Sequence, residues 1–243
     1  MRRPKVGEGN QEEEQESTRR YKSRLLLPCG VLSAMPATSL YNAILLVGPT
    51  GSGKTPLGEM CERKGLWGRS CLHFDFGEQL RKIVTGAPSS IALSRRDIAV
   101  IFRSLETGKL LEKEHSHIAG KMLSSFIEEK GAGKDVLLVM NGLPRHLSQA
   151  KYVDSLVEME MVLYLDCSPE VVKQRILLNS GGDRTARVDD SLPEVEMKLK
   201  LFRERTFPIL DYYRSKGIRV EQIEVGTEST LDTIHHSLND ITL

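Results

Sequence analysis

Residues 43 to 55 read Ala-Ile-Leu-Leu-Val-Gly-Pro-Thr-Gly-Ser-Gly-Lys-Thr. The apolar start of this stretch predicts a buried strand, and Gly48 is followed five positions later by Gly53, Lys54 and Thr55. This spacing is the G-x-x-x-x-G-K-S/T pattern of a phosphate-binding loop between a strand and a helix. A glycine-rich turn that matches by chance is the alternative, but the apolar run before it and the amphipathic run after it disfavour that interpretation. The stretch therefore predicts a site for a nucleoside triphosphate.

Each part of this loop has a chemical role in binding phosphate. Glycines let the backbone curl until several N–H groups point at one anion. Lys54 can reach the β- and γ-phosphates, and the Thr55 hydroxyl can contact a magnesium ion. Pro56 suits the first turn of the helix that follows, whose N-terminal dipole favours an anion. We therefore expect ATP and Mg²⁺ on a loop that comprises Gly48, Pro49, Thr50, Gly51, Ser52, Gly53, Lys54 and Thr55.

The charge and cysteine content exclude several classes of protein. With 34 Lys and Arg against 33 Asp and Glu, the formal net charge is +1, so the chain lacks the basic excess that nucleic-acid binding needs. No apolar stretch approaches the ~18 residues of a membrane span. The four cysteines include no C-x-x-C pair, which argues against a disulfide framework and a zinc site; they are Cys29, Cys61, Cys71 and Cys167. We expect a monomeric, cytoplasmic chain without a nucleic-acid or membrane partner.

The first forty residues differ from the rest of the chain. An acidic run over 12–16 precedes a basic run over 19–24, and neither strand nor helix periodicity is sustained. We expect residues 1–40 to be a disordered extension or a targeting segment, although the acidic run does not suit a simple transit peptide. Residues 41–243 then form one α/β domain, with Met35 as an alternative start.

Five short apolar runs alternate with amphipathic stretches after residue 40. This alternation predicts a parallel sheet of about five strands with helices on both faces, the fold of P-loop nucleoside triphosphate hydrolases. Ligands of such sheets bind beyond the carboxyl ends of the strands. Two insertions break the pattern: a helical one over about 77–127, and a short, glycine-rich and charged one over about 179–187 that we expect to move as a lid. The expected strands are Ala43–Val47, Cys71–Phe76, Val136–Asn141, Met161–Asp166 and Val220–Val225.

The third expected strand ends in a segment with a known pattern. Asn141–Arg145, with Gln149 four residues later, resembles the D-G-F/I/L-P-R-x-x-x-Q signature of adenylate kinases and related nucleoside monophosphate kinases. Three more segments agree in order: Gly77–Arg81 is similar to the family's G-D-x-L-R, Gly108–Leu111 to its G-K-L-V, and Arg187–Asp190 to the R-x-D-D after its lid. The resemblance covers the whole globular part of the chain.

The resemblance implies roles for particular residues. The long insertion would bind an acceptor monophosphate; Arg81 and Arg145 would hold its phosphate, and Gln149 would read its base. Arginine suits this task because its planar fork binds phosphate oxygens in pairs. The implied acceptor site comprises Gly77, Arg81, Leu111, Gly142, Arg145 and Gln149. The implied catalytic residues, which stabilise the charge of the transferred group, are Lys54, Arg145, Arg175, Arg187 and Lys198.

Ordinary structural interpretations stay open for several of these residues. Arg81 follows an apolar residue on an expected helix and could be a solvated surface arginine. Arg145 could have a plain surface role, and Arg175 could lie on a helix face without touching a ligand. The Asp189–Asp190 pair, which the resemblance assigns to ordering the lid, could be an N-cap of the helix expected over 191–213.

Three positions depart from the family pattern. Asn141 replaces a carboxylate that in the family orders water on magnesium, and an amide supplies no charge. Phe76 replaces a threonine that contacts the accepted base, which leaves only stacking. Lys198 replaces an arginine and lacks its fork. Asp75, at the end of the second expected strand, is our candidate to take over part of the magnesium-ordering role, together with Thr55.

The sequence thus predicts magnesium-dependent transfer of the ATP γ-phosphoryl group to a nucleoside monophosphate, with AMP as the expected acceptor. A general base is not needed, because the acceptor phosphate is already an anion at neutral pH. One alternative is a P-loop kinase of a small hydroxylated metabolite, in which Asp75 would serve as the base. Another is a nucleotide-binding regulatory protein with weak catalysis, which the three departures would suit.

Overall fold

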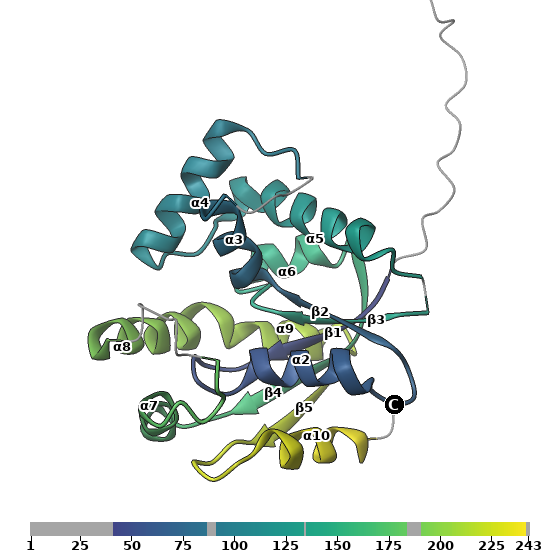
Figure 1. Cartoon of the computed structure of the whole chain (residues 1–243), viewed down its shortest axis with the longest axis vertical. Coiled ribbons are helices and arrows are strands. Elements are labelled where there is room, and N and C mark those ends of the chain that lie inside the picture. The colour runs from purple at the N-terminus through teal and green to yellow at the C-terminus, as the bar shows by residue number, and fades with distance from the viewer. Residues whose placement is uncertain (1–40, 87–90, 134, 184–190, 242–243) are drawn as a thin grey trace, which may run out of the picture. The chain divides into compact units, whose positions relative to one another are not determined.

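A sheet of five parallel strands organises the described part of the chain. The computed structural model describes residues 41–86, 91–133, 135–183 and 191–241, so the expected extension over 1–40 and residues 184–187 of the expected lid lie outside it. The strand order is β2-β3-β1-β4-β5 (Figure 1). The strands are β1 (Tyr41–Val47), β2 (Cys71–Asp75), β3 (Leu137–Asn141), β4 (Val157–Asp166) and β5 (Arg219–Glu224).

This sheet confirms the predicted fold class, and the five strands lie where the apolar runs indicated. The largest difference is in β4, which begins at Val157, before the expected Met161. The first part of β4 alternates buried Val157 and Met159 with exposed Glu158. The continuous apolar run that predicted this strand therefore marks only the part that is buried on both faces.

Helices cover both faces of the sheet (Figure 1), because alternate residues of β1 point to opposite sides. Ala43 and Leu45 join an apolar cluster with α3, α4, α5, α6 and α9, whereas Ile44 and Leu46 join a second cluster with α2, α7, α8 and α10. The helices are α2 (Lys54–Lys64), α3 (Phe76–Val84), α4 (Arg95–Thr107), η1 (Lys113–His115), α5 (Ser116–Lys130), α6 (Leu147–Val153), α7 (Pro169–Leu177), α8 (Leu192–Leu201), η2 (Phe202–Thr206), α9 (Pro208–Ser215) and α10 (Leu231–Asn239). Among the described residues, no helix has both the length and the apolar character needed to cross a membrane.

The long insertion lies between β2 and β3 and consists of α3, α4, η1 and α5. A capping box fixes the start of α4: the Asp97 N–H donates to Ser94 Oγ at 3.1 Å, and the Ser94 N–H donates to Asp97 Oδ2 at 3.0 Å. The helix ends at Gly108, whose φ of 67° is in the left-handed region that glycine adopts without strain. This turn brings the next residues back into the core, where Leu110 and Leu111 are buried.

The single helix expected over 191–213 is divided. Its middle is a π-helical turn, η2, between α8 and α9. The wider turn is closed by a hydrogen bond of 2.8 Å from the Phe207 N–H to the Phe202 carbonyl. Pro208 follows directly, and proline lacks an N–H and clashes with the preceding turn of a regular α-helix. The π-turn lets the chain continue in one direction across this proline.

Candidate active site

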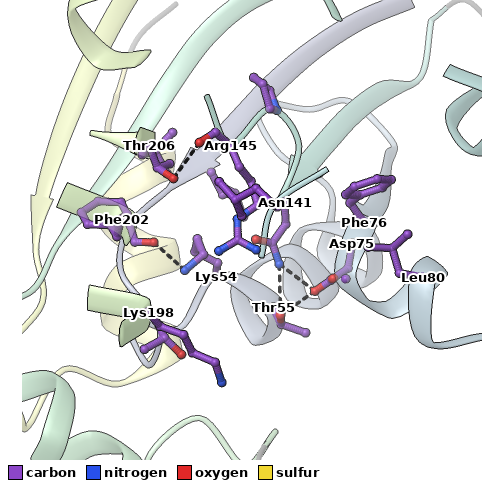
Figure 2. A pocket seen from close by; sticks show the side chains of 18 of the residues that line it. Lys54, Thr55, Asp75, Phe76, Leu80, Asn141, Arg145, Lys198, Phe202 and Thr206 are labelled. Carbon is purple, nitrogen blue, oxygen red and sulfur yellow. Dashed lines mark hydrogen bonds between the residues drawn. The ribbon is translucent and has the colours of Figure 1, made fainter. Parts of the chain in front are cut away.

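One cavity of about 220 Å³ lies at the carboxyl ends of β1, β2 and β3. These ends are adjacent because β3 pairs with both β1 and β2. Residues at or after the carboxyl ends of β1, β2 and β3 line the cavity, as expected for a parallel sheet (Figure 2): they belong to the phosphate loop, 75–77 and 141–142. The residues that follow β4, 167–168, are not among the described residues that line it. Ser168 instead accepts a hydrogen bond from the Val171 N–H and caps α7.

The phosphate loop needs glycine at two positions for different reasons. A Cβ at Gly48 would lie 2.7 Å from Ser52 Oγ and 2.8 Å from the Leu165 carbonyl oxygen, so no side chain fits there. Gly53 has a φ of 96° and forms the N-cap of α2, which directs the N-terminus of that helix to the loop. Of the eight predicted loop residues, all line the cavity except Pro49 and Ser52.

Lys54 lies over the phosphate loop. Its Nζ donates to the Gly48 carbonyl at 2.7 Å and to the Pro49 carbonyl at 2.6 Å. The ammonium group is thus held at the centre of the curled backbone, where phosphate oxygens can compete for its protons. The site contains the positive charge and the helix N-terminus that an anion requires.

Thr55, Asp75 and Asn141 form a hydrogen-bonded triangle at the floor of the cavity (Figure 2). The Thr55 hydroxyl donates to Asp75 Oδ2 at 2.7 Å, and Asn141 Nδ2 donates to Asp75 Oδ2 at 2.7 Å and to Thr55 Oγ1 at 3.0 Å. Asp75 and Asn141 are register partners at the ends of β2 and β3. In the family pattern, a carboxylate stands at the end of the third strand, where this chain has Asn141. Here the carboxylate belongs to Asp75, at the end of the neighbouring strand β2.

The Asp75 carboxylate is ionised although it is only 6% exposed. Burial opposes ionisation and would raise its pKa, but hydrogen bonds from the Thr55 hydroxyl and the Glu78 N–H, with the charges of His73 and Arg81, lower the pKa below its usual value. The Glu78 N–H donates to Asp75 Oδ1 at 2.9 Å, so the same side chain caps α3. One residue thus fixes the start of the insertion and supplies negative charge to the cavity.

The donors in this triangle suit a magnesium ion. Mg²⁺ prefers hard oxygen ligands and is usually held by one or two carboxylates together with substrate phosphates and water. The Thr55 hydroxyl and the Asp75 carboxylate are such oxygens, and both line the cavity. Within the described residues, no three His, Cys, Asp or Glu side chains are grouped so that they could hold a metal by themselves. The donor set therefore fits a magnesium ion that arrives with a nucleotide.

The six predicted acceptor-site residues all line the same cavity as the phosphate loop. They come from α3, from the turn after α4, from the turn between β3 and α6, and from α6 itself. Burial lowers the pKa of Arg145, and the charge of nearby Asp75 partly offsets this effect; an arginine remains charged even so. The Thr206 hydroxyl donates to the Arg145 carbonyl at 2.9 Å and holds this residue from η2 (Figure 2).

Gln149 is held at both ends of its side-chain amide. The Arg145 N–H donates to Gln149 Oε1 at 2.8 Å, and Gln149 Nε2 donates to the Leu111 carbonyl at 2.8 Å. The carboxamide thereby links the two walls of the acceptor end. Phe76 lines the cavity but is only 3% exposed, and its ring packs 6.2 Å from that of Phe74. Most of the Phe76 ring belongs to the core, which leaves little of it for the stacking that the sequence suggested.

The predicted catalytic residues lie in different places. Lys54, Arg145 and Lys198 line the cavity. Arg175, expected to face the transferring phosphates, is 2% exposed and is not among the lining residues. Its Nε donates to the Gly51 carbonyl at 3.2 Å, and its Nη1 to the Gly226 and Ser229 carbonyls at 2.8 and 2.9 Å. Arg175 thus braces the phosphate loop from behind. The predicted residues Arg187, Asp189 and Asp190 lie outside the described residues.

Several cavity residues were missed from the sequence. Asp183, Ser104 and Phe202 line the cavity, and no pattern singled them out. His146 was missed as well, although it lies within the R-x-x-x-Q segment; it is not among the residues that line the cavity but lies directly behind them. It is buried and its Nε2 lies 2.8 Å from the Leu111 carbonyl oxygen. Its position inside a recognised segment was the only signal that could have identified it.

The chain is similar in sequence to several known proteins. The AAA domain family model matches residues 47–196. An adenylate kinase of Prochlorococcus marinus is 25% identical over 73% of this chain and 87% of its own length. A probable UMP-CMP kinase 1 of Arabidopsis thaliana is 29% identical over 72% of this chain and 76% of its own length. A solved shikimate kinase of Acinetobacter baumannii, in complex with shikimate, covers 82% of this chain and 90% of that one at 19% identity, but its TM-score of 0.44 is too low to bear on function. The chain belongs to the AAA domain family and is an enzyme of the adenylate kinase and nucleoside monophosphate kinase family.

Proposed function

We propose that the protein transfers the γ-phosphoryl group of ATP to a nucleoside monophosphate and forms two nucleoside diphosphates. One observation carries this proposal: a single cavity is lined by the phosphate loop at one end and by Arg81, Arg145 and Gln149 at the other. Two nucleotides bound at these ends would meet with their phosphates between them. The relatives named adenylate kinase and UMP-CMP kinase support the same reaction.

The chemistry of this transfer depends on positioning and on cations. Charge spreads over the oxygens of the transferred group in the transition state, and fixed cations stabilise it. Lys54 would bind the β- and γ-phosphates of ATP, and Arg145 would grip the acceptor phosphate with its planar fork. Lys198 would add a charge from α8, and Arg187 would add another when the lid closes. Arg175 would act by holding the phosphate loop in shape.

Thr55 and Asp75 would hold the magnesium ion. A magnesium ion held there would supply positive charge that offsets part of the charge of the phosphates. Asn141 would keep the Asp75 carboxylate in place, because its Nδ2 donates to Asp75 Oδ2. The carboxylate that orders the metal would thus come from β2, with an amide beside it on β3.

A coupled assay with ATP and each of AMP, CMP, UMP, GMP and dTMP tests the proposal. We expect diphosphate formation, fastest with AMP, in line with the relatives named adenylate kinase. If diphosphate forms only from a pyrimidine monophosphate, the proposed reaction stands, and the acceptor is that monophosphate and not AMP. ATP consumption only with a small hydroxylated metabolite, or tight nucleotide binding without turnover, would overturn the proposed reaction.

A further inference from the structure

The strongest unexplained feature of the acceptor end is His146, a buried histidine that the proposed function does not use. It is 3% exposed and is the N-cap residue of α6. Its Nδ1 lies 2.9 Å from Ser148 Oγ and 3.4 Å from the Gln149 backbone nitrogen. Its Nε2 lies 2.8 Å from the Leu111 carbonyl oxygen. Both ring nitrogens therefore have partners, on two separate segments of the chain.

These partners determine the form of the ring. The Leu111 carbonyl can only accept, so Nε2 must carry a hydrogen. The Gln149 N–H can only donate, so Nδ1 must accept from it, and the Ser148 hydroxyl can donate to the same nitrogen. The neutral imidazole with its hydrogen on Nε2 satisfies every contact. His146 is thus a fixed bridge between α6 and the chain after α4.

The hydrogen bond from His146 fixes the carbonyl of Leu111, a residue that lines the acceptor end of the cavity. The Leu111 carbonyl accepts from both His146 Nε2 and Gln149 Nε2. A carbonyl oxygen has two lone pairs, so these two donors fix the direction of the peptide group. Leu111 and Gln149 line the cavity, whereas His146 is not among the lining residues. The histidine therefore holds two walls of the acceptor site without contacting a ligand in it.

We propose that His146 is a positioning residue for the acceptor nucleotide: it fixes the Leu111 peptide, and through it the side chain of Gln149, in the arrangement that receives the monophosphate. This inference rests on the proposed function, because it assigns the acceptor to this end of the cavity. Within the described part of the chain, the hydrogen-bond partners of His146 are Leu111, Ser148 and Gln149, and none of them lies on the phosphate loop at the other end, so we expect the effect to be confined to one substrate.

Two substitutions separate positioning from helix capping. Asparagine can accept the Gln149 N–H and cap α6, but it is too short to reach the Leu111 carbonyl. Glutamine carries an N–H at about the reach of histidine Nε2 but is a poor cap. The proposal predicts that His146→Asn raises KM for the acceptor about fivefold, as expected for one lost hydrogen bond, with KM for ATP unchanged. His146→Gln should keep both KM values and lower the melting temperature by about 3 °C.

The acceptor used is the monophosphate that the wild-type enzyme converts fastest. Hydrogen exchange over 108–112 without nucleotide provides a second readout, and it should be faster in His146→Asn than in wild type and unchanged in His146→Gln. If His146→Asn keeps the wild-type acceptor KM and exchange rates while His146→Gln is impaired, His146 is only a helix cap and the inference is wrong. If the wild-type protein forms no diphosphate from any monophosphate, the proposed function fails, and the order of the exchange rates still decides whether His146 positions Leu111.

Discussion

The two ends of the cavity are built in different ways. The donor end is one continuous segment, 48–55, in which glycines shape the backbone and the helix α2 follows at once. The acceptor end combines three segments that are distant in sequence: 77–81, 108–111 and 142–149. Gln149 joins the third of these segments to the second through the Leu111 carbonyl, and Thr206 holds the third segment from η2. A local site can be recognised from its spacing, whereas an assembled site depends on contacts that only the fold creates.

The largest effect should come from Lys54, the lysine of the phosphate loop at the donor end. Lys54→Met keeps the length of the side chain and removes its charge, so we expect a loss of kcat on the order of 10³-fold. The fold should persist, which circular dichroism would check. A variant that keeps more than a tenth of the wild-type kcat would show that the phosphate loop does not stabilise the transferred group through this residue.

At the acceptor end, Arg145→Lys should lower kcat/KM for the monophosphate about 10²-fold, because lysine keeps the charge but loses the paired hydrogen bonds. KM for ATP should stay within about twofold, since the donor end is a separate segment. Arg81→Lys is the matched control at an exposed residue of α3, and we expect it to cost tenfold or less. If the exposed Arg81 proves the more costly of the two, Arg145 is not the main phosphate contact.

A smaller effect should appear where the two ends meet, at the triangle of Thr55, Asp75 and Asn141. Asp75→Asn should weaken the apparent affinity for Mg²⁺ about tenfold, the usual range for a residue that orders a metal site. The exchange variant Asp75→Asn/Asn141→Asp returns a carboxylate to β3 and should recover part of the loss, because the two residues are register partners. Unchanged turnover and magnesium dependence in Asp75→Asn would remove Asp75 from the metal site.

The sequence was sufficient for features that depend on neighbours in the chain. The strand before the phosphate loop, the loop itself and the positions of the five strands along the chain follow from local apolar runs and glycine spacing. Asp75 could be singled out because it ends a strand, and the carboxyl ends of parallel strands meet at one edge.

Features that depend on distant contacts could not be predicted. Nothing in the sequence indicated that Arg175 donates to the carbonyls of Gly51 and Gly226, because those residues are far away in the chain. The same holds for His146, whose partner Leu111 lies 35 residues earlier. Phe76 was expected to stack on a base, but the aromatic ring of Phe74 beside it draws it into the core. Side-chain direction was the missing information in all three cases.

The central claim is that one cavity holds both nucleotides, and a ligand that spans it tests this claim most directly. Two nucleosides joined by a chain of phosphates would place one nucleoside at each end, with phosphates on Lys54 and Arg145. Isothermal titration calorimetry should show a single binding event. Lys54→Met should weaken it about tenfold or more because it removes a charge, and Arg145→Lys should do the same because lysine loses the paired hydrogen bonds of the guanidinium. If Arg145→Lys leaves the Kd unchanged while Lys54→Met raises it, the ligand occupies only the donor end, and the acceptor site is not where we place it.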